Sequence, residues 1–503
     1  MLFKRINYLY IAMLLTFFLL GFPIGEPFGG YSAISEFKRI WFLVVCGGFV
    51  IILVVLRLMV AAISPMSVNI IENIKKIPLA GKLMLGFLLA TMISAVFSSY
   101  SGTFWGSFRR EGVLTIAIYV LSFFLLIYYF HPKKWMLYLL GVVMMPVSLL
   151  ALVQLTGANP FALYPPGLNY YGAGVYYAAG KFLSTIGNAG LLGGIVVLAI
   201  GIMAMAIIKF ESRERWLLVL PLFFTLMLVF SMGVDAALVA VLAGMVLMLP
   251  VAVTNRVTLA NTLMVFAVMA AAFTLSRLII FQDRPIMIAA VRISYLVAIA
   301  ALILMTKVVM KAELFDKIPA NQYRGGAITV VIGTGTLVFL FLWTYSGASD
   351  SMIYEASQVL RGNFDDNFGT SRIFIWRSVL ERITWGNLLL GTGPDTLGYW
   401  DIPIFERVDV YGRHFTSNID AAHNEMLHIL ATGGLFSLVA YLGALVVAAV
   451  GWFRQPNNVL SAIAGAGVLF YVIQAFFGIS QFIAAPFFWT CFGVLVYAQE
   501  NVT

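Results

Sequence analysis

Residues 361–382 read RGNFDDNFGTSRIFIWRSVLER, and residues 420–437 read DAAHNEMLHILATGGLFS. Both stretches belong to the longest interval of the chain without a membrane-spanning apolar run, from Arg361 to Ser437. The sequence on either side is strongly apolar, so a polar segment of this length must lie in water at a membrane face and fold against helix ends. We expect it to be an extracytoplasmic loop that carries the chemistry of the protein.

The composition is that of a protein that crosses a membrane many times. Of 503 residues, 62% are hydrophobic and 11% are charged, whereas soluble domains carry about 25% charged residues. The mean hydropathy is +0.97. Apolar runs long enough to cross a hydrocarbon core of about 30 Å predict an all-α protein with about 12–14 transmembrane helices. They lie near 8–22, 39–61, 79–97, 113–130, 135–155, 182–208, 214–232, 235–253, 259–281, 286–308, 325–346, 427–450, 459–477 and 481–498.

These runs divide the chain into transmembrane helices with short loops at 1–346, a large loop at 347–426 and C-terminal transmembrane helices at 427–503. Cytoplasmic loops retain Lys and Arg, and the basic residues between the runs fall on one side if both termini are cytoplasmic. The loop 347–426 is then outside. The same bias explains the net charge of +9, which gives no reason to expect a nucleic acid partner.

The long loop contains a candidate anion site at Arg372. Thr370 or Ser371 is a plausible N-cap, and apolar residues at helical spacing after it predict a short amphipathic helix at the membrane interface. Arg372 then lies beside unpaired backbone N–H groups, a combination that favours an anion such as diphosphate. The alternative is a basic face beside anionic lipid headgroups. The turn at 391–395 lacks the Lys-Ser/Thr of a phosphate loop.

His423 is the candidate catalytic base. Asp420 is a good N-cap candidate, which predicts that His423 lies in the first turn of the helix that follows. A positive helix end disfavours imidazolium, so such a histidine stays neutral and can accept a proton. His428 is about 140° away around a helix, at about 100° per residue, so we expect it not to share that proton. The alternative is a histidine with a structural role only.

Two earlier outer loops contain further candidates. Arg109 and Arg110 lie on the side that should be poor in positive charge, and guanidinium groups fit phosphate oxygens. The alternative is an interfacial anchor in which an arginine pairs with Glu111. Asn188 begins another apolar run, where a buried amide would need a hydrogen-bonding partner. Small residues four apart, Gly190 and Gly194, let two helices approach closely there.

The chain resembles the O-antigen ligase/polymerase family of bacterial envelope glycosyltransferases. His423-Asn424, nine residues and then Gly434 resemble the H-N-x9-G signature of the family. Ser371-Arg372-x-x-Ile375-Trp376, with Leu389-Leu390-Gly391-Thr392-Gly393-Pro394 after it, is similar to the arginine-containing helix and Gly-rich turn of the family. Residues 106–112 and 185–188 look like its outer-loop motifs. The likeness covers about residues 100–445.

The resemblance implies a GT-C-type membrane glycosyltransferase that needs neither a metal nor a cofactor. It would move a glycan from an undecaprenyl-diphosphate carrier to a hydroxyl of a lipid, a glycan or a protein, at the outer face of the bacterial cytoplasmic (inner) membrane. The expected catalytic residues are His423 and Arg372. The expected diphosphate-binding or glycan-binding residues are Arg109, Arg110, Asn188, Trp376, Arg377 and Asn424.

Two points stay open from the sequence. Many relatives have an arginine in a Ser-Arg-Gly-Ala motif, whereas this chain reads Ser231-Met232-Gly233-Val234-Asp235-Ala236. One phosphate-binding arginine is therefore missing. The alternative function is a transporter or flippase of lipid-linked glycans, although the inverted repeats common in transporters are not visible. Ligase and polymerase activity are not distinguished.

Overall fold

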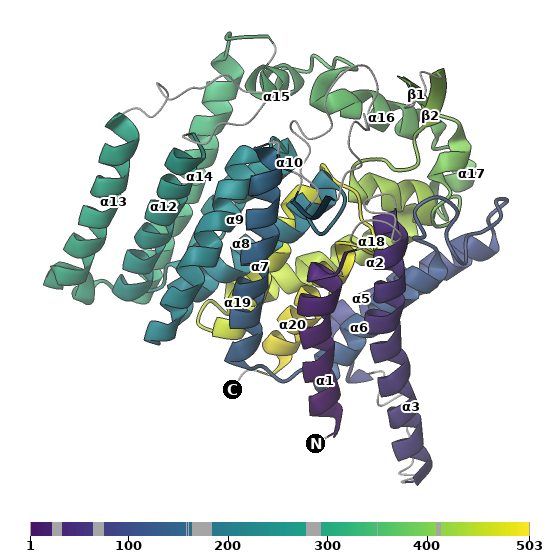
Figure 1. The fold of residues 1–503 in the computed structure, drawn as a ribbon, viewed down its shortest axis with the longest axis horizontal. Coiled ribbons are helices and arrows are strands. Elements are labelled where there is room, and N and C mark those ends of the chain that lie inside the picture. The colour runs from purple at the N-terminus through teal and green to yellow at the C-terminus, as the bar shows by residue number, and fades with distance from the viewer. Residues whose placement is uncertain are drawn as a thin grey trace.

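The computed structural model describes residues 2–22, 33–63, 75–156, 158, 160–162, 184–277, 293–349, 351–408 and 414–501. Its long helices form a bundle, and both ends of the chain lie at the same end of that bundle (Figure 1). Long apolar segments form helices because the backbone N–H and C=O groups inside a bilayer must be satisfied within the segment itself.

The first third of the chain supplies one side of the bundle. Its helices are α1 (Leu2–Met13), η1 (Leu14–Phe18), α2 (Ile34–Phe42), η3 (Leu43–Gly47), α3 (Gly48–Ile63), α5 (Leu79–Val96), α6 (Val113–Tyr129), α7 (Lys134–Leu155) and η4 (Pro160–Ala162). Here η1 and η3 are π-helical turns. Since η3 joins its neighbours without a break, α2, η3 and α3 form one continuous helix of 30 residues.

The middle of the chain supplies the core. Its helices are α8 (Ala189–Lys209), η5 (Arg213–Leu218), α9 (Val219–Ser231), α10 (Asp235–Leu247), α11 (Leu249–Ala252) and α12 (Arg256–Ser276). The central element is α8, whose span is 94% buried. Its glycines let α19 (Val459–Ala475) approach closely, since a Cβ at Gly194 would lie 3.2 Å from the Gln474 amide oxygen. The close approach predicted at Gly194 is therefore found.

The last part of the chain contains an exposed helical pair, an irregular segment and the final helices. The elements are α13 (Ile293–Lys311), η7 (Glu313–Lys317), α14 (Ala320–Thr344), α15 (Met352–Leu360), α16 (Phe368–Arg382), α17 (Trp385–Leu388), η8 (Leu397–Trp400), β1 (Pro403–Val408), β2 (His414–Asn418), α18 (Glu425–Arg454), α19 and α20 (Ala485–Glu500). The strands form an antiparallel hairpin. Only 6% of the α13 and α14 spans is buried.

The predicted fold class is confirmed. Among the described residues, nine helices are long and apolar enough to cross a membrane, and three shorter apolar helices accompany them. The described parts of the predicted runs coincide with helices, whereas residues 182–183, 278–281 and 286–292 of these runs lie outside the described residues. The structure also contains the small β1–β2 hairpin, which the all-α prediction did not include and which lies in the polar segment before α18.

The polar segment between α14 and α18 has a small apolar core of its own. The buried side chains of this core are Ile375, Val379, Leu397, Ile402, Ile419, Ala422 and Ala431. They come from α16, from η8 and its neighbourhood, and from the start of α18. Apolar burial therefore fixes α16 against the residues that lead into α18, where the candidate base is located.

The positions of the chain termini and of the polar segment agree with one predicted feature of the topology. In Figure 1 the two chain ends lie at the bottom, whereas α15, α16 and the hairpin lie at the top. The termini and the polar segment are thus at opposite ends of the bundle, as the distribution of basic residues predicts. Which end faces the cytoplasm stays a prediction.

That orientation can be tested by cysteine labelling. We expect a membrane-impermeant thiol reagent, applied to intact cells, to label a cysteine at Asn363, which is exposed in the polar segment. A cysteine at Asn457, exposed between α18 and α19, should react only after the membrane is permeabilised. Labelling of Asn457→Cys but not Asn363→Cys in intact cells would show the reverse orientation.

Candidate active site

His423 lies immediately before α18, in the left-handed backbone region with φ +48°. The N-cap of α18 is Asn424, whose side-chain oxygen accepts a hydrogen bond from the Leu427 N–H at 2.9 Å. The prediction that Asp420 caps this helix is therefore wrong, as is the prediction that His423 lies in its first turn. Asn and Asp are equally good N-caps. Here Asp420 does not cap the helix because its carboxylate pairs with an arginine.

That arginine is Arg109, which comes from the loop before α6. Its Nη2 donates to the Asp420 carboxylate at 2.6 Å, and its side chain is only 19% exposed. The loop is held in place by Asp395, whose carboxylate accepts the backbone N–H groups of Phe108 and Arg109 at 2.9 and 2.8 Å. Burial raises the pKa of the Asp395 carboxyl, while these two N–H groups oppose that shift. Arg109 is therefore fixed beside the residues that lead to His423.

Arg372 reaches the same region from α16. The predicted caps Thr370 and Ser371 are wrong, because both residues have left-handed backbone angles and provide no side-chain cap. The regular helix consequently starts at Arg372. Its Nε donates to the Phe477 carbonyl at 3.1 Å and its Nη1 to the Gly369 carbonyl at 2.6 Å. Two fixed bonds hold the guanidinium in one orientation.

The surroundings of Arg372 are partly buried and include the acidic group of Asp235. Burial lowers the pKa of the Arg372 guanidinium, and the negative charge of Asp235, the first residue of α10, opposes this. Asp235 is the residue found where the resemblance described above leads us to expect an arginine. In this chain it therefore lies within electrostatic range of the remaining arginine.

The imidazole of His423 is kept neutral by its environment. Its pKa is lowered to about 4, first by burial and then by the positive charges of Arg109 and Arg372, while Asp420 acts in the opposite direction. The cause differs from the helix end inferred from the sequence, but the consequence is the same. At neutral pH the histidine carries no charge and has a lone pair that can accept a proton. The structure thus brings His423, Arg109 and Arg372 together.

Trp376 positions the histidine rather than joining this group directly. Its indole Nε1 donates to the Ala422 carbonyl at 3.0 Å, and its ring meets Phe476 edge-on at 5.8 Å between centroids. Ala422 is completely buried. The residue before His423 is therefore anchored from α16 and from the end of α19.

Four other predicted site residues interact with residues outside this group. The exposed side chain of Arg110 lies on a left-handed turn, and its charge acts on Glu36. Arg377 pairs with Asp366 at an exposed position. The amide oxygens of Asn424 and Asn188 accept N–H groups as helix N-caps, from Leu427 and Leu191. Asn188 is exposed, so it is not the buried amide that the sequence suggested. Contact of these residues with substrate stays a prediction.

A comparison with known protein families points to the same region of the chain as the candidate site. Residues 285–442 match the family model described as O-antigen ligase. The match confirms the resemblance to the O-antigen ligase/polymerase family and supports an enzyme of that kind in a membrane. No curated protein matches the chain.

The matched region, residues 285–442, contains Arg372, Trp376, Arg377, His423 and Asn424. Arg109, Arg110 and Asn188 lie before the matched residues. The salt bridge between Arg109 and Asp420 therefore joins a loop of the earlier helices to the matched region. This long-range pair is what completes the candidate site.

The Gly-rich turn and the last residue of the His-Asn signature are in close backbone contact within the matched region. Gly434 interrupts α18 with φ +78°, and a Cβ there would lie 2.3 Å from the Leu389 carbonyl oxygen. A Cβ at Gly391 would lie 2.3 Å from the Thr432 carbonyl oxygen. The N–H groups of Thr392 and Gly393 donate hydrogen bonds to the Ala431 and Thr432 carbonyls, which the break in α18 leaves without a helical partner. Only glycine permits this approach at both positions.

A cavity of about 60 Å³ lies among α5, α6, α18 and α20, and the sequence analysis did not predict it. Glu111, Glu425 and His428 line it. Burial raises the pKa of the Glu111 carboxyl to about 8, so this group is protonated at neutral pH. Glu425 Oε2 and His428 Nδ1 have no hydrogen-bond partner in the described part of the chain. The signal in the sequence was Glu111, which directly follows the two arginines.

Proposed function

We propose that this protein transfers a glycan from an undecaprenyl-diphosphate carrier to an acceptor hydroxyl, as an O-antigen ligase or a polysaccharide polymerase. The observation that carries the proposal is the neutral His423, on which the charges of Arg109 and Arg372 both act. A neutral base beside two cations suits a reaction in which a hydroxyl is deprotonated and a diphosphate leaves. The family match to the O-antigen ligase supports it independently.

In the proposed reaction the acceptor oxygen attacks the anomeric carbon of the lipid-linked glycan. The new carbon–oxygen bond forms as the bond from that carbon to the diphosphate oxygen breaks, and His423 takes the hydroxyl proton. Direct displacement inverts the anomeric configuration. A positioned base of this kind contributes about 10²–10⁴-fold to the rate. Diphosphate is a good leaving group, so the mechanism needs no general acid.

Arg372 and Arg109 are proposed to neutralise the diphosphate. The Nη2 of Arg372 makes no recorded hydrogen bond within the described segments, since its Nε and Nη1 are the atoms that bind backbone carbonyls. The Arg109 Nε is buried without a partner in the same part of the chain. Each guanidinium group therefore has a donor that the described residues do not use, and we propose that the two groups bind phosphate oxygens by charge-assisted hydrogen bonds.

The proposed setting is the outer face of a bacterial cytoplasmic membrane, with the segment 347–426 as the catalytic loop. The polar segment lies at the end of the bundle opposite the termini (Figure 1), which suits a lipid-linked donor that enters from the membrane. We also propose that the reaction needs no metal ion. The acceptor is a hydroxyl of lipid A-core, of another glycan or of a protein.

The proposal is tested with purified full-length protein and an undecaprenyl-diphosphate-linked glycan. We expect the release of free undecaprenyl diphosphate and the appearance of a glycosylated acceptor, measured by mass spectrometry, with and without excess chelator. Loss of activity with chelator would remove the metal-free mechanism. Movement of intact lipid-linked glycan between leaflets, without bond cleavage, would show the transporter instead.

The two neighbouring arginines of the outer loop should behave differently. We expect Arg109→Gln to lower glycan transfer by about 10- to 100-fold, because it removes a partly buried cation and leaves Asp420 unpaired. Arg110→Gln should stay within about threefold of the wild type, since exposed side chains contribute little. Both rates are measured with saturating donor. Equal losses in the two variants would contradict the assignment of Arg109 to the site.

A further inference from the structure

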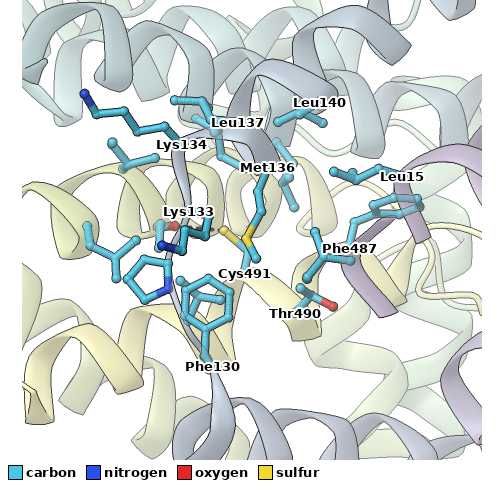
Figure 2. A pocket seen from close by; sticks show the side chains of 18 of the residues that line it. Leu15, Phe130, Lys133, Lys134, Met136, Leu137, Leu140, Phe487, Thr490 and Cys491 are labelled. Carbon is cyan, nitrogen blue, oxygen red and sulfur yellow. Dashed lines mark hydrogen bonds between the residues drawn. The ribbon is translucent and has the colours of Figure 1, made fainter. Parts of the chain in front are cut away.

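A second pocket lies at the other end of the bundle from the candidate site. Its volume is about 400 Å³, and it is lined almost entirely by apolar side chains from both ends of the chain. They include Leu15, Met136, Leu140, Ile463, Phe487 and Cys491. The stacking of Phe3 of α1 on Tyr129 at the end of α6 places the mouth near the N-terminal end of α1. Figure 2 shows the lining side chains around an open centre.

The mouth of this pocket is positively charged. Lys133 and Lys134 line it and are exposed, and in Figure 2 both lie to the left of the centre, on the side opposite to Leu15 and Phe487. The charges of Lys4 and Lys133, after burial, lower the pKa of the neighbouring His131. Lys134 Nζ is 4.0 Å from Glu214, but both side chains are about 60% exposed, so this pair is weak.

The dimensions of the pocket favour a flexible chain as its occupant. Its volume lies in the range of about 300–1,000 Å³ that is usual for small-ligand sites. A helix about 10 Å wide occupies roughly 400 Å³ in each turn of 5.4 Å, so a membrane-spanning helix does not fit. Apolar walls alone cannot select a ligand inside a bilayer, because lipid tails are as apolar as leucine. Selectivity must come from the charged mouth.

We propose that this pocket binds an acyl chain of an anionic phospholipid, whose phosphate group is held at Lys133 and Lys134. The lysines supply the attraction for the headgroup, as basic pockets between transmembrane helices do. The apolar walls fix the position of the chain. Such a lipid would join α1, α7, α19 and α20, which come from opposite ends of the sequence, without contact with the candidate active site.

The test measures lipid binding to the full-length protein in detergent by native mass spectrometry. The probes are phosphatidylglycerol and phosphatidylcholine with identical acyl chains. We expect tighter binding of phosphatidylglycerol, by about tenfold or more, and a loss of about fivefold for each lysine replaced in Lys133→Gln and Lys134→Gln. Lys311→Gln, which replaces an exposed lysine of α13 outside the pocket, is the matched control and should bind as the wild type does.

A second variant tests the apolar part of the pocket. Leu137 is half-buried in the wall, and Leu137→Trp should fill the pocket and weaken phosphatidylglycerol binding with both lysines intact. Wild-type affinity in the double lysine variant would overturn the proposal, as would equal affinity for phosphatidylcholine. Displacement of the lipid by an equal concentration of inorganic phosphate would also overturn it, because the site would then be a simple phosphate site.

Discussion

His423→Ala is expected to reduce glycan transfer by about 10²–10⁴-fold, the usual contribution of a positioned base. The reason is that the neutral imidazole, beside Arg109 and Arg372, is the group that takes the acceptor proton in the proposed reaction. The loss should appear in kcat, since the two arginines proposed to bind the diphosphate remain. The rate is measured with purified protein at saturating donor.

Two further variants separate catalysis from folding. His423 has a left-handed backbone, which asparagine adopts more readily than alanine, so His423→Asn should fold well and be as inactive as His423→Ala. His428→Ala should retain activity within about tenfold, because His428 faces the cavity among α5, α6, α18 and α20. Activity near the wild-type level in His423→Asn would remove the base from the mechanism.

Arg372→Lys should reduce kcat/KM for the donor by about 10- to 150-fold, although the charge is conserved. Hydrogen bonds to charged groups are worth about 1.5–3 kcal/mol each. The guanidinium binds the Phe477 and Gly369 carbonyls with two of its nitrogens and leaves the third for phosphate. An ammonium group offers one nitrogen and cannot bind in all three directions with this geometry.

Arg377→Lys is the matched control for that variant. Arg377 lies on the same helix, but its side chain is half-exposed and pairs with Asp366. Exposed pairs of this type contribute about 0–1 kcal/mol, so kcat/KM should change by less than about fivefold. If Arg372→Lys and Arg377→Lys had the same small effect, Arg372 would be a general cation of the surface and not part of the site.

Features that depend on local sequence could be predicted. The apolar runs correspond to helices because hydrocarbon leaves a long apolar segment few other conformations. Gly194 was expected to permit a close helix contact, and α19 makes it. Such predictions succeed because the residues themselves contain the reason for the structure.

The sequence around α18 does not show which of two candidate residues caps this helix. In Asp420-Ala-Ala-His-Asn424 both ends are good N-caps. Asn424 caps α18 because Asp420 binds Arg109, which is 311 residues away in the sequence. The left-handed backbone angles of Thr370 and Ser371 could likewise not be predicted from the sequence, since Thr and Ser usually mark a regular helix start.

The site itself depends on contacts between distant segments. Trp376 holds the Ala422 carbonyl, Arg372 holds the Phe477 carbonyl, and Asp395 holds the loop of Arg109. Motifs indicated most of these residues but not which ones meet. The sequence reasoning therefore grouped Arg109 with Arg110, whereas only Arg109 reaches the acidic partner of the site.

The most direct test of the proposed base is the pH dependence of the wild-type reaction. With a pKa of about 4 in the free protein, His423 is mostly neutral above about pH 5, so kcat/KM should be constant from about pH 8 to 5 and fall only below that. Bound diphosphate adds negative charge near the imidazole and raises its pKa, so the fall in kcat should occur at higher pH. An inflection of kcat/KM near pH 6.5, or the same profile in the residual activity of His423→Asn, would contradict the account.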